Sequence, residues 1–274
     1  MSALEKLLPY FKDKTALITG ASSGIGRATA ELLTVLGCNV VIVARHQPGL
    51  DATLELLEKS RRNPNQKFEA FSIDLRKSED IVEGIELIAN KYRIDIVFNN
   101  AGVYYTNYFQ NQTVEQIKSM VLTNIMAPLL LTRTLIPHFL KQGSGQVVNV
   151  SSLAAKLNFT GYGVYGGTKA GLSHSSKGLH FEFVPKEIYF SDFFAPDSLT
   201  RGYEEELKTM PEETKKINGT VKPMDPKDVA LSMLQGVAKR KLEIIPGFKS
   251  QAISFLAKHL PVSSIQFILR LLSK

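Results

Sequence analysis

The sequence is poor in cysteine and has no long apolar run. Its one cysteine, Cys38, excludes an intrachain disulfide and a zinc cluster built from thiolates. No uninterrupted stretch of about 18 apolar residues occurs, so the sequence predicts no simple membrane-spanning helix. The N-terminal segment 1–14 has apolar residues spaced for a short amphipathic helix and is not a secretory signal. Together these absences favour a cytoplasmic protein in a reducing compartment.

Acidic residues are missing from the C-terminal end, because none follows Glu243. The whole chain carries a formal net charge of +7, which suits nucleic acid, an anionic membrane or a phosphorylated ligand. There is no zinc finger, no RNP-like aromatic motif and no arginine-rich tract. We therefore expect neither a nucleic-acid partner nor a bound metal.

Short β-branched runs alternate with longer helical patterns along the chain. The predicted strands cover 15–19, 39–44, 68–74, 94–99, 146–151 and 187–194, and the predicted helices cover 25–36, 51–61, 78–91, 113–140 and 166–183. This alternation predicts right-handed βαβ units. The expected fold class is α/β, a Rossmann-type doubly wound parallel sheet, with residues 1–274 in a single domain.

A polar segment with several prolines, 196–225, interrupts this rhythm. Long insertions in α/β domains are often substrate loops, and we expect a helical substrate lid here. The alternative is a solvated surface excursion. Residues 248–274 form a second addition, which we expect to be an apolar, basic helical extension.

A glycine-rich turn follows the first predicted strand. Gly20, Gly24 and Gly26 in the sequence GASSGIG allow a tight turn and close approach of the backbone to a pyrophosphate. The helix that starts here adds free N–H groups and the positive end of its dipole. The pattern therefore predicts a dinucleotide site, with a glycine turn that binds no ligand as the alternative.

The end of the second predicted strand indicates which dinucleotide is bound. NAD enzymes usually place a carboxylate there for the ribose 2′-hydroxyl. This chain has Ala44 and Arg45 instead, and a guanidinium suits a 2′-phosphate. Arg27, just after the glycines, could assist. The predicted cofactor is NADPH/NADP+, the alternative being that Arg45 is merely solvent-exposed.

Five short motifs occur in order between residues 15 and 200. They are TGASSGIG (19–26), NNAG (99–102), LTNIMAP with Asn124, NVSSLAA after the fifth predicted strand, and YGGTK (165–169). In this order they resemble the motifs of the short-chain dehydrogenase/reductase family. The resemblance implies a nicotinamide-dependent oxidoreductase.

The resemblance also implies a catalytic set, which is Asn124, Ser152, Tyr165 and Lys169. Ser152 fits the serine pattern of the family better than the alternative, Ser151. Tyr165 would transfer the proton, and Lys169, one helical turn away, is expected to lower the pKa of its phenol. Lys169 would also grip the nicotinamide ribose, and Asn124 would hold a water that links Lys169 to solvent.

The cofactor-binding residues implied by the resemblance follow the same motifs. Asp74 is expected at the adenine ring and Asn99 at the border of the cleft. Pro196-Asp197 replaces the Pro-Gly that is usual in the family, so contacts of Ser198 and Thr200 with the nicotinamide amide depend on a changed loop. The full set is Gly20, Ser22, Ser23, Gly24, Ile25, Gly26, Arg45, Asp74, Leu75, Asn100, Ala101, Gly102, Tyr165, Lys169, Pro196, Ser198 and Thr200.

The segment 196–215 resembles the corresponding part of 3-ketodihydrosphingosine reductases. The shared features are Pro196-Asp197, an aromatic residue before the acidic run 204–206, and PEETK at 211–215. The resemblance implies NADPH-dependent reduction of a long-chain lipid ketone, 3-ketodihydrosphingosine to dihydrosphingosine. The acidic run around Glu204 would attract the substrate amine. The alternatives are a reductase of a steroid, retinoid or 3-oxoacyl group and, remotely, a non-catalytic NADP-binding scaffold.

Apolar residues of the C-terminal extension follow helical spacing, among them Ile265, Ile268, Leu269 and Leu272. A basic, apolar helix of this kind predicts either peripheral contact with a membrane or packing on the domain or a partner subunit. In a eukaryote the membrane would be the cytosolic face of the endoplasmic reticulum. The family resemblance also implies a homodimer or homotetramer that pairs through the helices at 113–140 and 166–183.

Overall fold

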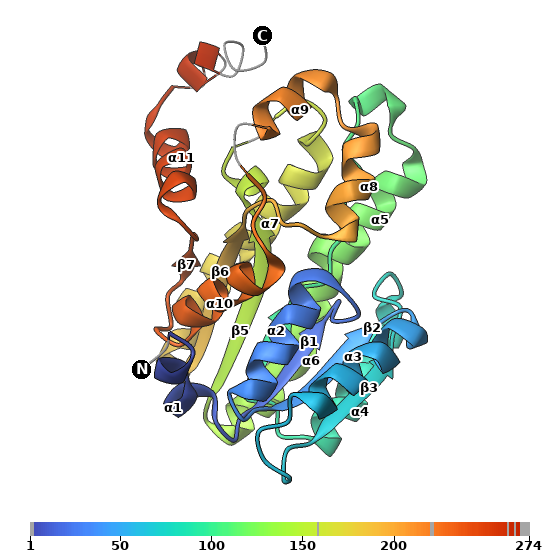
Figure 1. Ribbon diagram of the computed structural model, residues 1–274, viewed down its shortest axis with the longest axis vertical. Helices are drawn as coiled ribbons and strands as arrows, with labels where there is room; N and C mark the ends of the chain where they lie inside the picture. Colours follow the sequence, from blue (N-terminus) through green and yellow to red (C-terminus); the bar gives the residue numbers. More distant parts are fainter. Residues whose placement is uncertain (1–2, 158, 220–221, 262, 266, 269–274) are drawn as a thin grey trace.

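A computed structural model describes residues 3–157, 159–219, 222–261, 263–265 and 267–268. The described residues form a seven-stranded sheet in the order β3-β2-β1-β4-β5-β6-β7, and all neighbouring strands are parallel (Figure 1). This confirms the predicted doubly wound sheet. The strands are β1 (Thr15–Thr19), β2 (Asn39–Ala44), β3 (Phe68–Ser72), β4 (Ile96–Asn99), β5 (Gly145–Ser152), β6 (Ile188–Ala195) and β7 (Glu243–Ile244).

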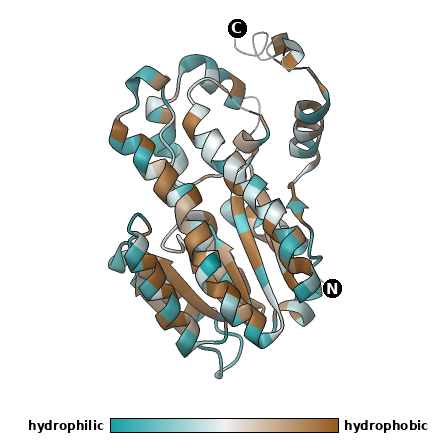
Figure 2. Ribbon diagram, turned by 180° about the vertical axis from the view of Figure 1, so that it is seen from behind, coloured by the Kyte–Doolittle hydropathy of each residue, from teal (hydrophilic) through white to brown (hydrophobic). Residues whose placement is uncertain are grey.

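Helices cover both faces of the sheet and bury an apolar cluster on each. One face packs against α1 (Leu8–Phe11), α2 (Gly24–Val35), α3 (Gln47–Lys59) and α10 (Pro226–Val237). The other packs against α4 (Ser78–Lys91), α6 (Ala127–Gln142) and α7 (Gly163–Phe183). Because both faces are covered, the strands are apolar along most of their length, as Figure 2 shows.

Most boundaries differ from the predicted ones by one to three residues, and three differences are larger. The helix α3 starts at Gln47, four residues before the prediction, because Pro48 in its first turn is tolerated there although it resembles a turn signal. The predicted helix 113–140 is divided into α5 (Val114–Val121), a π-helical turn (Leu122–Met126) and α6. The strand β7 was not expected, since two residues carry no readable alternation.

The segment Val114–Gln142 is the one helical stretch of the described residues that is long and apolar enough to cross a membrane. Length and composition alone give this result, and half of its most apolar window is buried inside the fold. Leu131, Leu135 and Phe139 on its inner face belong to the apolar cluster beneath α4 and α7. The stretch is therefore packed as a core helix. Polar residues interrupt it, so it does not contain the uninterrupted apolar run that a simple membrane-spanning helix would show.

The carboxyl ends of β1, β4, β5 and β6 meet at one edge of the sheet, where a ligand crevice is expected in this topology. The insertion 196–225 forms α8 (Arg201–Thr209) and α9 (Glu212–Asn218) above that edge, beside the upper end of α7 (Figure 1). Beyond β7, α11 (Phe248–His259) extends away from the sheet on the same side. Short 3₁₀ turns lie at Glu5–Leu7, Phe109–Asn111, Leu153–Ala155 and Val184–Lys186.

Candidate active site

The glycine turn between β1 and α2 is shaped by steric need. Gly20 and Gly24 have positive φ angles of 68° and 56°, a region that residues with side chains rarely adopt. A Cβ on Gly20 would stand 2.8 Å from the Cα of Ala101. The helix α2 begins directly at Gly24, so the unpaired N–H groups of its first turn face the crevice. The turn thus has the form of an anion cradle.

Asn100, which follows β4, holds this turn in place. Its side-chain Nδ2 donates to the carbonyl oxygen of Thr19 at 2.9 Å, and its backbone N–H donates to Oγ1 of Thr19 at 3.1 Å. A Cβ on Gly26 would collide with the Asn100 amide and with the Gly20 carbonyl. Gly26 therefore supports the cradle from below and does not line the crevice.

One end of the crevice carries exposed cations, and we name it the arginine end. It is lined by Arg45, which follows β2, and by Asp74, Leu75 and Arg76, which follow β3. Arg76 Nη2 lies 2.6 Å from Asp74 Oδ2, and this hydrogen bond lowers the pKa of Asp74 to about 2. Arg76 was not predicted as a site residue, because nothing in its local sequence pattern distinguishes it from other surface arginines.

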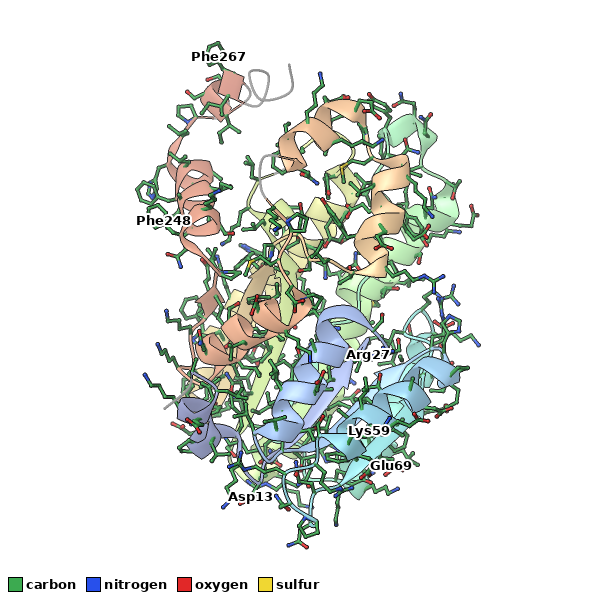
Figure 3. All side chains as sticks on the ribbon, in the orientation of Figure 1. Asp13, Arg27, Lys59, Glu69, Phe248 and Phe267 are labelled. Atoms are coloured by element: carbon green, nitrogen blue, oxygen red, sulfur yellow. The ribbon has the colours of Figure 1, made fainter. Side chains whose placement is uncertain are left out.

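The prediction that Arg27 assists at a 2′-phosphate is not supported by its position. Its Nε donates to Oγ1 of Thr53 in α3 at 3.1 Å, and its Nη2 donates to the carbonyl oxygen of Ser22. Figure 3 shows Arg27 between α2 and α3. The guanidinium therefore braces the glycine turn instead of facing a ligand.

Three predicted catalytic side chains meet at the centre of the crevice. Ser152 ends β5, Tyr165 lies in the first turn of α7, and Lys169 follows one turn later. The Ser152 hydroxyl lies within hydrogen-bonding reach of the phenol of Tyr165. Ser151 is buried, and its hydroxyl donates to the backbone carbonyl of Lys169 at 3.2 Å. The serine beside the phenol is thus Ser152.

The electrostatics of this centre differ from the prediction. Burial raises the pKa of Tyr165, and the carboxylate of Glu206 raises it further, so the phenol is not activated by Lys169 as expected. Burial also lowers the pKa of Lys169 to about 8. Lys169 is 3% exposed, and its Nζ donates to the carbonyl oxygen of Val150 at 2.7 Å. The ammonium is therefore aimed at the end of β5 and not at the phenol.

Asn124 lies beneath the crevice in the π-helical turn. Its side chain makes two hydrogen bonds with the backbone of Val103, at 2.9 Å from the Val103 N–H to Oδ1 and at 2.7 Å from Nδ2 to the Val103 carbonyl. A Cβ on Gly102 would stand 3.2 Å from Lys169 Nζ and 3.4 Å from Asn124 Oδ1. Asn124 and Lys169 thus flank Gly102, and the proposed water link between them stays a prediction.

Most predicted binding residues line this one crevice. Asn99 is an exception, because it is buried in the sheet with its Nδ2 2.8 Å from Asn149 Oδ1, so its expected place at the border of the cleft is wrong. The predicted residues that line the crevice are Gly20, Ser22, Ser23, Gly24, Ile25, Arg45, Asp74, Leu75, Asn100, Ala101, Gly102, Ser152, Tyr165, Lys169, Pro196, Ser198 and Thr200.

The other end of the crevice is acidic, and we name it the carboxylate end. Asp197 follows β6, and Glu206 lies in α8 as the last residue of the acidic run 204–206 that was expected to attract an amine. Oε1 of Glu206 accepts a hydrogen bond of 2.5 Å from Thr106. Burial raises the pKa of Glu206 and raises that of Asp197 to about 6. Glu204, which was expected to attract an amine, is exposed on the opposite face of α8.

An apolar cavity of about 290 Å³ adjoins the carboxylate end. It shares Ser152, Tyr162 and Asp197 with the crevice. Its other walls come from the turn after β5, from α9 and from the C-terminal extension, and they include Leu153, Leu157, Phe159, Ile217, Ile253, Leu256, Ala257, Leu260, Ile265 and Ile268. A path lined by apolar side chains thus leads from the reacting hydroxyls to α11.

A family model described as short chain dehydrogenase matches residues 14–205. The chain belongs to the short-chain dehydrogenase family. This dehydrogenase is 31% identical to a 3-dehydrosphinganine reductase of Danio rerio over 216 residues, which are 78% of this chain and 65% of that protein. It is 34% identical to a ketoacyl reductase of a Nostoc species over 181 residues, or 65% of this chain and 61% of that protein.

Solved structures of the family share its fold. A short-chain dehydrogenase from Sphingobium yanoikuyae in complex with NADPH superposes with a TM-score of 0.75 at 29% identity, covering 90% of this chain and 96% of that one. The predicted family and fold class are therefore confirmed. The chain spans less than two thirds of the length of the two curated relatives named above.

Proposed function

We propose that this chain reduces the ketone of a long-chain lipid with NADPH, and most specifically that it converts 3-ketodihydrosphingosine to dihydrosphingosine. The observation that carries the proposal is the apolar cavity that meets the crevice at Ser152 and Asp197. A ketone held at Ser152 and Tyr165 could extend an alkyl chain into this cavity, where burial of each CH₂ contributes about 0.8 kcal/mol. The 3-dehydrosphinganine reductase relative supports the same substrate class.

The crevice fits a dinucleotide of the NADP type. The turn from Gly20 to Gly24 offers backbone N–H groups to the pyrophosphate, and Arg45 with Arg76 offers positive charge to a 2′-phosphate. When bound, NADPH would supply the hydride. The NADPH complex of the Sphingobium relative supports this choice.

The chain's own groups would supply the proton and hold the substrate. With its pKa raised, Tyr165 is protonated at neutral pH and can donate its proton to the alkoxide oxygen that forms as a ketone is reduced. Ser152 would orient that oxygen by a hydrogen bond. Lys169 would hold the nicotinamide ribose, and a water held by Asn124 would link Lys169 to solvent, from which the proton lost by Tyr165 is replaced.

The C-terminal extension presents apolar side chains outward as well as toward the cavity. Phe248 is 86% exposed, Phe255 63% and Phe267 64%, and Figure 3 shows Phe248 and Phe267 pointing away from the body of the protein. With Lys249 and Lys258 nearby, this face suits an anionic membrane surface. We therefore propose a cytoplasmic enzyme that works peripherally on a membrane. The predicted positions Leu269 and Leu272 lie outside the described residues.

The assembly proposed from the family resemblance is a homodimer or homotetramer. Phe181 on α7 is 75% exposed, and Val121 and Met126 lie exposed around the π-helical turn. These apolar side chains lie on the two helices through which we expect subunits to pair. Sedimentation of the full chain in detergent-free buffer measures its oligomeric state, and a monomer at micromolar concentration would contradict the proposal.

The substrate assignment is tested by NADPH consumption with 3-ketodihydrosphingosine in mixed micelles, beside steroid, retinoid and 3-oxoacyl ketones. We expect rapid turnover of the sphingoid ketone, and slower turnover of the others. The ketoacyl relative makes 3-oxoacyl reduction the second candidate. Preference for a 3-oxoacyl thioester would reverse the substrate assignment while leaving the reductase chemistry intact. No turnover of any ketone would favour the non-catalytic scaffold.

A further inference from the structure

Two carboxylates stand at the substrate side of the crevice without a cationic partner. No lysine or arginine of the described residues forms an ion pair with Asp197 or Glu206. Their neighbours Glu204 and Glu205 on α8 are exposed, and Glu205 is paired with Lys208 at 2.6 Å. Acidic side chains are almost never removed from water without a partner, because the charged form loses its hydration. This pair therefore calls for an explanation in terms of a ligand.

Glu206 is connected to the reacting phenol through aromatic neighbours. Tyr162 lies within hydrogen-bonding reach of the Glu206 carboxylate, and its ring centroid lies 5.9 Å from that of Tyr165. Tyr104 lies on another side, with its ring centroid 5.8 Å from that of Tyr165. The charge of Glu206 is near enough to raise the pKa of the Tyr165 phenol. Glu206 thus borders the space directly above the catalytic hydroxyls.

Asp197 borders the same space from the side of the apolar cavity. It lines both the crevice and the cavity, as Ser152 does. A substrate with its carbonyl oxygen at Ser152 and Tyr165 and its chain in the cavity must pass this carboxylate. The catalytic hydroxyls and the apolar cavity therefore mark the place as a ligand site independently of its acidity.

The chemistry of an amine beside a ketone matches this arrangement. In a 2-amino ketone the nitrogen is bonded to the carbon next to the carbonyl, so fixing the carbonyl oxygen also fixes the nitrogen within a few ångströms. A protonated amine there would neutralise two half-buried carboxylates that have no cationic partner among the described residues. An anionic thioester substrate would be repelled by the same pair.

We propose that Asp197 and Glu206 bind the protonated amine of the substrate and thereby select long-chain 2-amino ketones over neutral or anionic ketones with the same chain. This inference rests on the proposed lipid-ketone reductase function and names the residues that set its specificity. It narrows the expectation that the acidic run 204–206 attracts the amine to Glu206, and it adds Asp197.

The test compares two ketones with the same alkyl chain, 3-ketodihydrosphingosine and its N-acetyl derivative, whose nitrogen is uncharged, in mixed micelles with saturating NADPH. We expect Asp197→Asn and Glu206→Gln each to lower kcat/KM for the amine by about 10- to 100-fold, mainly through KM, since a hydrogen-bonded charge pair is lost. Turnover of the N-acetyl ketone should be unchanged or improved. Glu204→Gln, the same change on the exposed face of α8, is the matched control and should alter neither.

The outcomes separate this inference from the function on which it rests. Equal kcat/KM of the wild-type protein for both ketones would overturn the amine site alone. So would variants that lower turnover of both ketones to the same degree while NADPH binding, measured by fluorescence titration, stays intact. Failure of the wild-type protein to reduce either ketone would overturn the proposed function and the inference with it. Asp197→Asn and Glu206→Gln change different elements, so a folding defect in one variant still leaves the other for the test.

Discussion

At the arginine end of the crevice two exposed arginines accompany one aspartate, whereas at the carboxylate end two half-buried acids have no cationic partner among the described residues. The first end is built by residues that directly follow β2 and β3. The second is assembled from the residues after β4, the start of α7 and the insertion with α8. The difference teaches that the cofactor side is specified by short motifs at neighbouring strand ends. The substrate side arises only when distant segments fold together.

The largest effect is expected from a change at the centre of the crevice, between the arginine end and the carboxylate end. Tyr165→Phe removes the phenol hydroxyl placed beside Ser152, so turnover should fall by about 10²- to 10⁴-fold. NADPH affinity should be unchanged, because the crevice wall keeps its shape. Stopped-flow turnover and fluorescence titration measure the two quantities. A variant that retains more than a tenth of the activity would contradict the assignment of Tyr165 as the proton donor.

The next change breaks the arginine end. Arg45→Ala should weaken NADPH binding by about tenfold and leave NADH binding unaltered, since a charge-assisted contact with the 2′-phosphate is lost. Lys59→Ala, which removes an exposed charge farther along α3, is the control. Equal loss of affinity for both nucleotides would mean that Arg45 shapes the crevice and does not read the phosphate.

A smaller effect is expected from narrowing the apolar cavity beyond the carboxylate end. Ala257 faces this cavity, and Ala257→Phe should lower kcat/KM for a long-chain ketone by roughly fivefold through crowding, with less effect on a short-chain amino ketone. Lys258→Phe places the same ring on the exposed side of α11. The test measures kcat/KM against the chain length of the ketone for both variants. Identical dependences would indicate that the alkyl chain does not bind in this cavity.

The smallest effect concerns a third buried acid, Asp192 in β6, which lies in the sheet beneath the crevice and not on its wall. Burial raises its pKa from 3.8 to about 7, against the opposing effects of Ser176, Asn149 and Lys177. The folded state therefore holds this proton more tightly than the unfolded state, and stability falls as pH rises from about 4 to about 7.

Asp192→Asn cannot ionise, so its Tm should exceed that of the wild-type protein by about 2–4 °C at pH 8 and match it at pH 4. Unlike Asp197→Asn, it should leave the ratio of the kcat/KM values for the two ketones unchanged. The comparison thus distinguishes an acid that affects stability from an acid that binds the substrate. Scanning calorimetry at both pH values measures the difference in Tm between the variant and the wild-type protein. A Tm gain that is largest at pH 4 would reverse the sign of the argument.

The cofactor side could be predicted from the sequence because its residues lie in contiguous motifs. GASSGIG, NNAG and YGGTK each place their side chains at one strand end or in one helical turn, and the strand–helix alternation fixes where those ends meet. Arg27 and Asn99 were misplaced because spacing alone does not show which way a side chain turns. One hydrogen-bonds inside the turn and the other inside the sheet.

The substrate side could not be predicted in the same way. Glu204, Glu205 and Glu206 are equivalent in sequence, and only the packing of α8 over Thr106 and Tyr162 turns Glu206 inward. The Tyr165 pKa is raised by burial first and by Glu206 second, and neither contribution can be read from the spacing of Tyr165 and Lys169. The cavity wall contributed by α11 depends on how the extension docks, which local helical spacing does not specify.

The most direct test of the account is a steady-state comparison of four reactions, with NADPH or NADH and with 3-ketodihydrosphingosine or its N-acetyl derivative. The account predicts the highest kcat/KM for NADPH with the amine. Changing the cofactor and changing the ketone should cause losses that multiply, because the two charges are read at opposite ends of the crevice. Equal rates in all four reactions would contradict the claim that the oppositely charged ends set specificity.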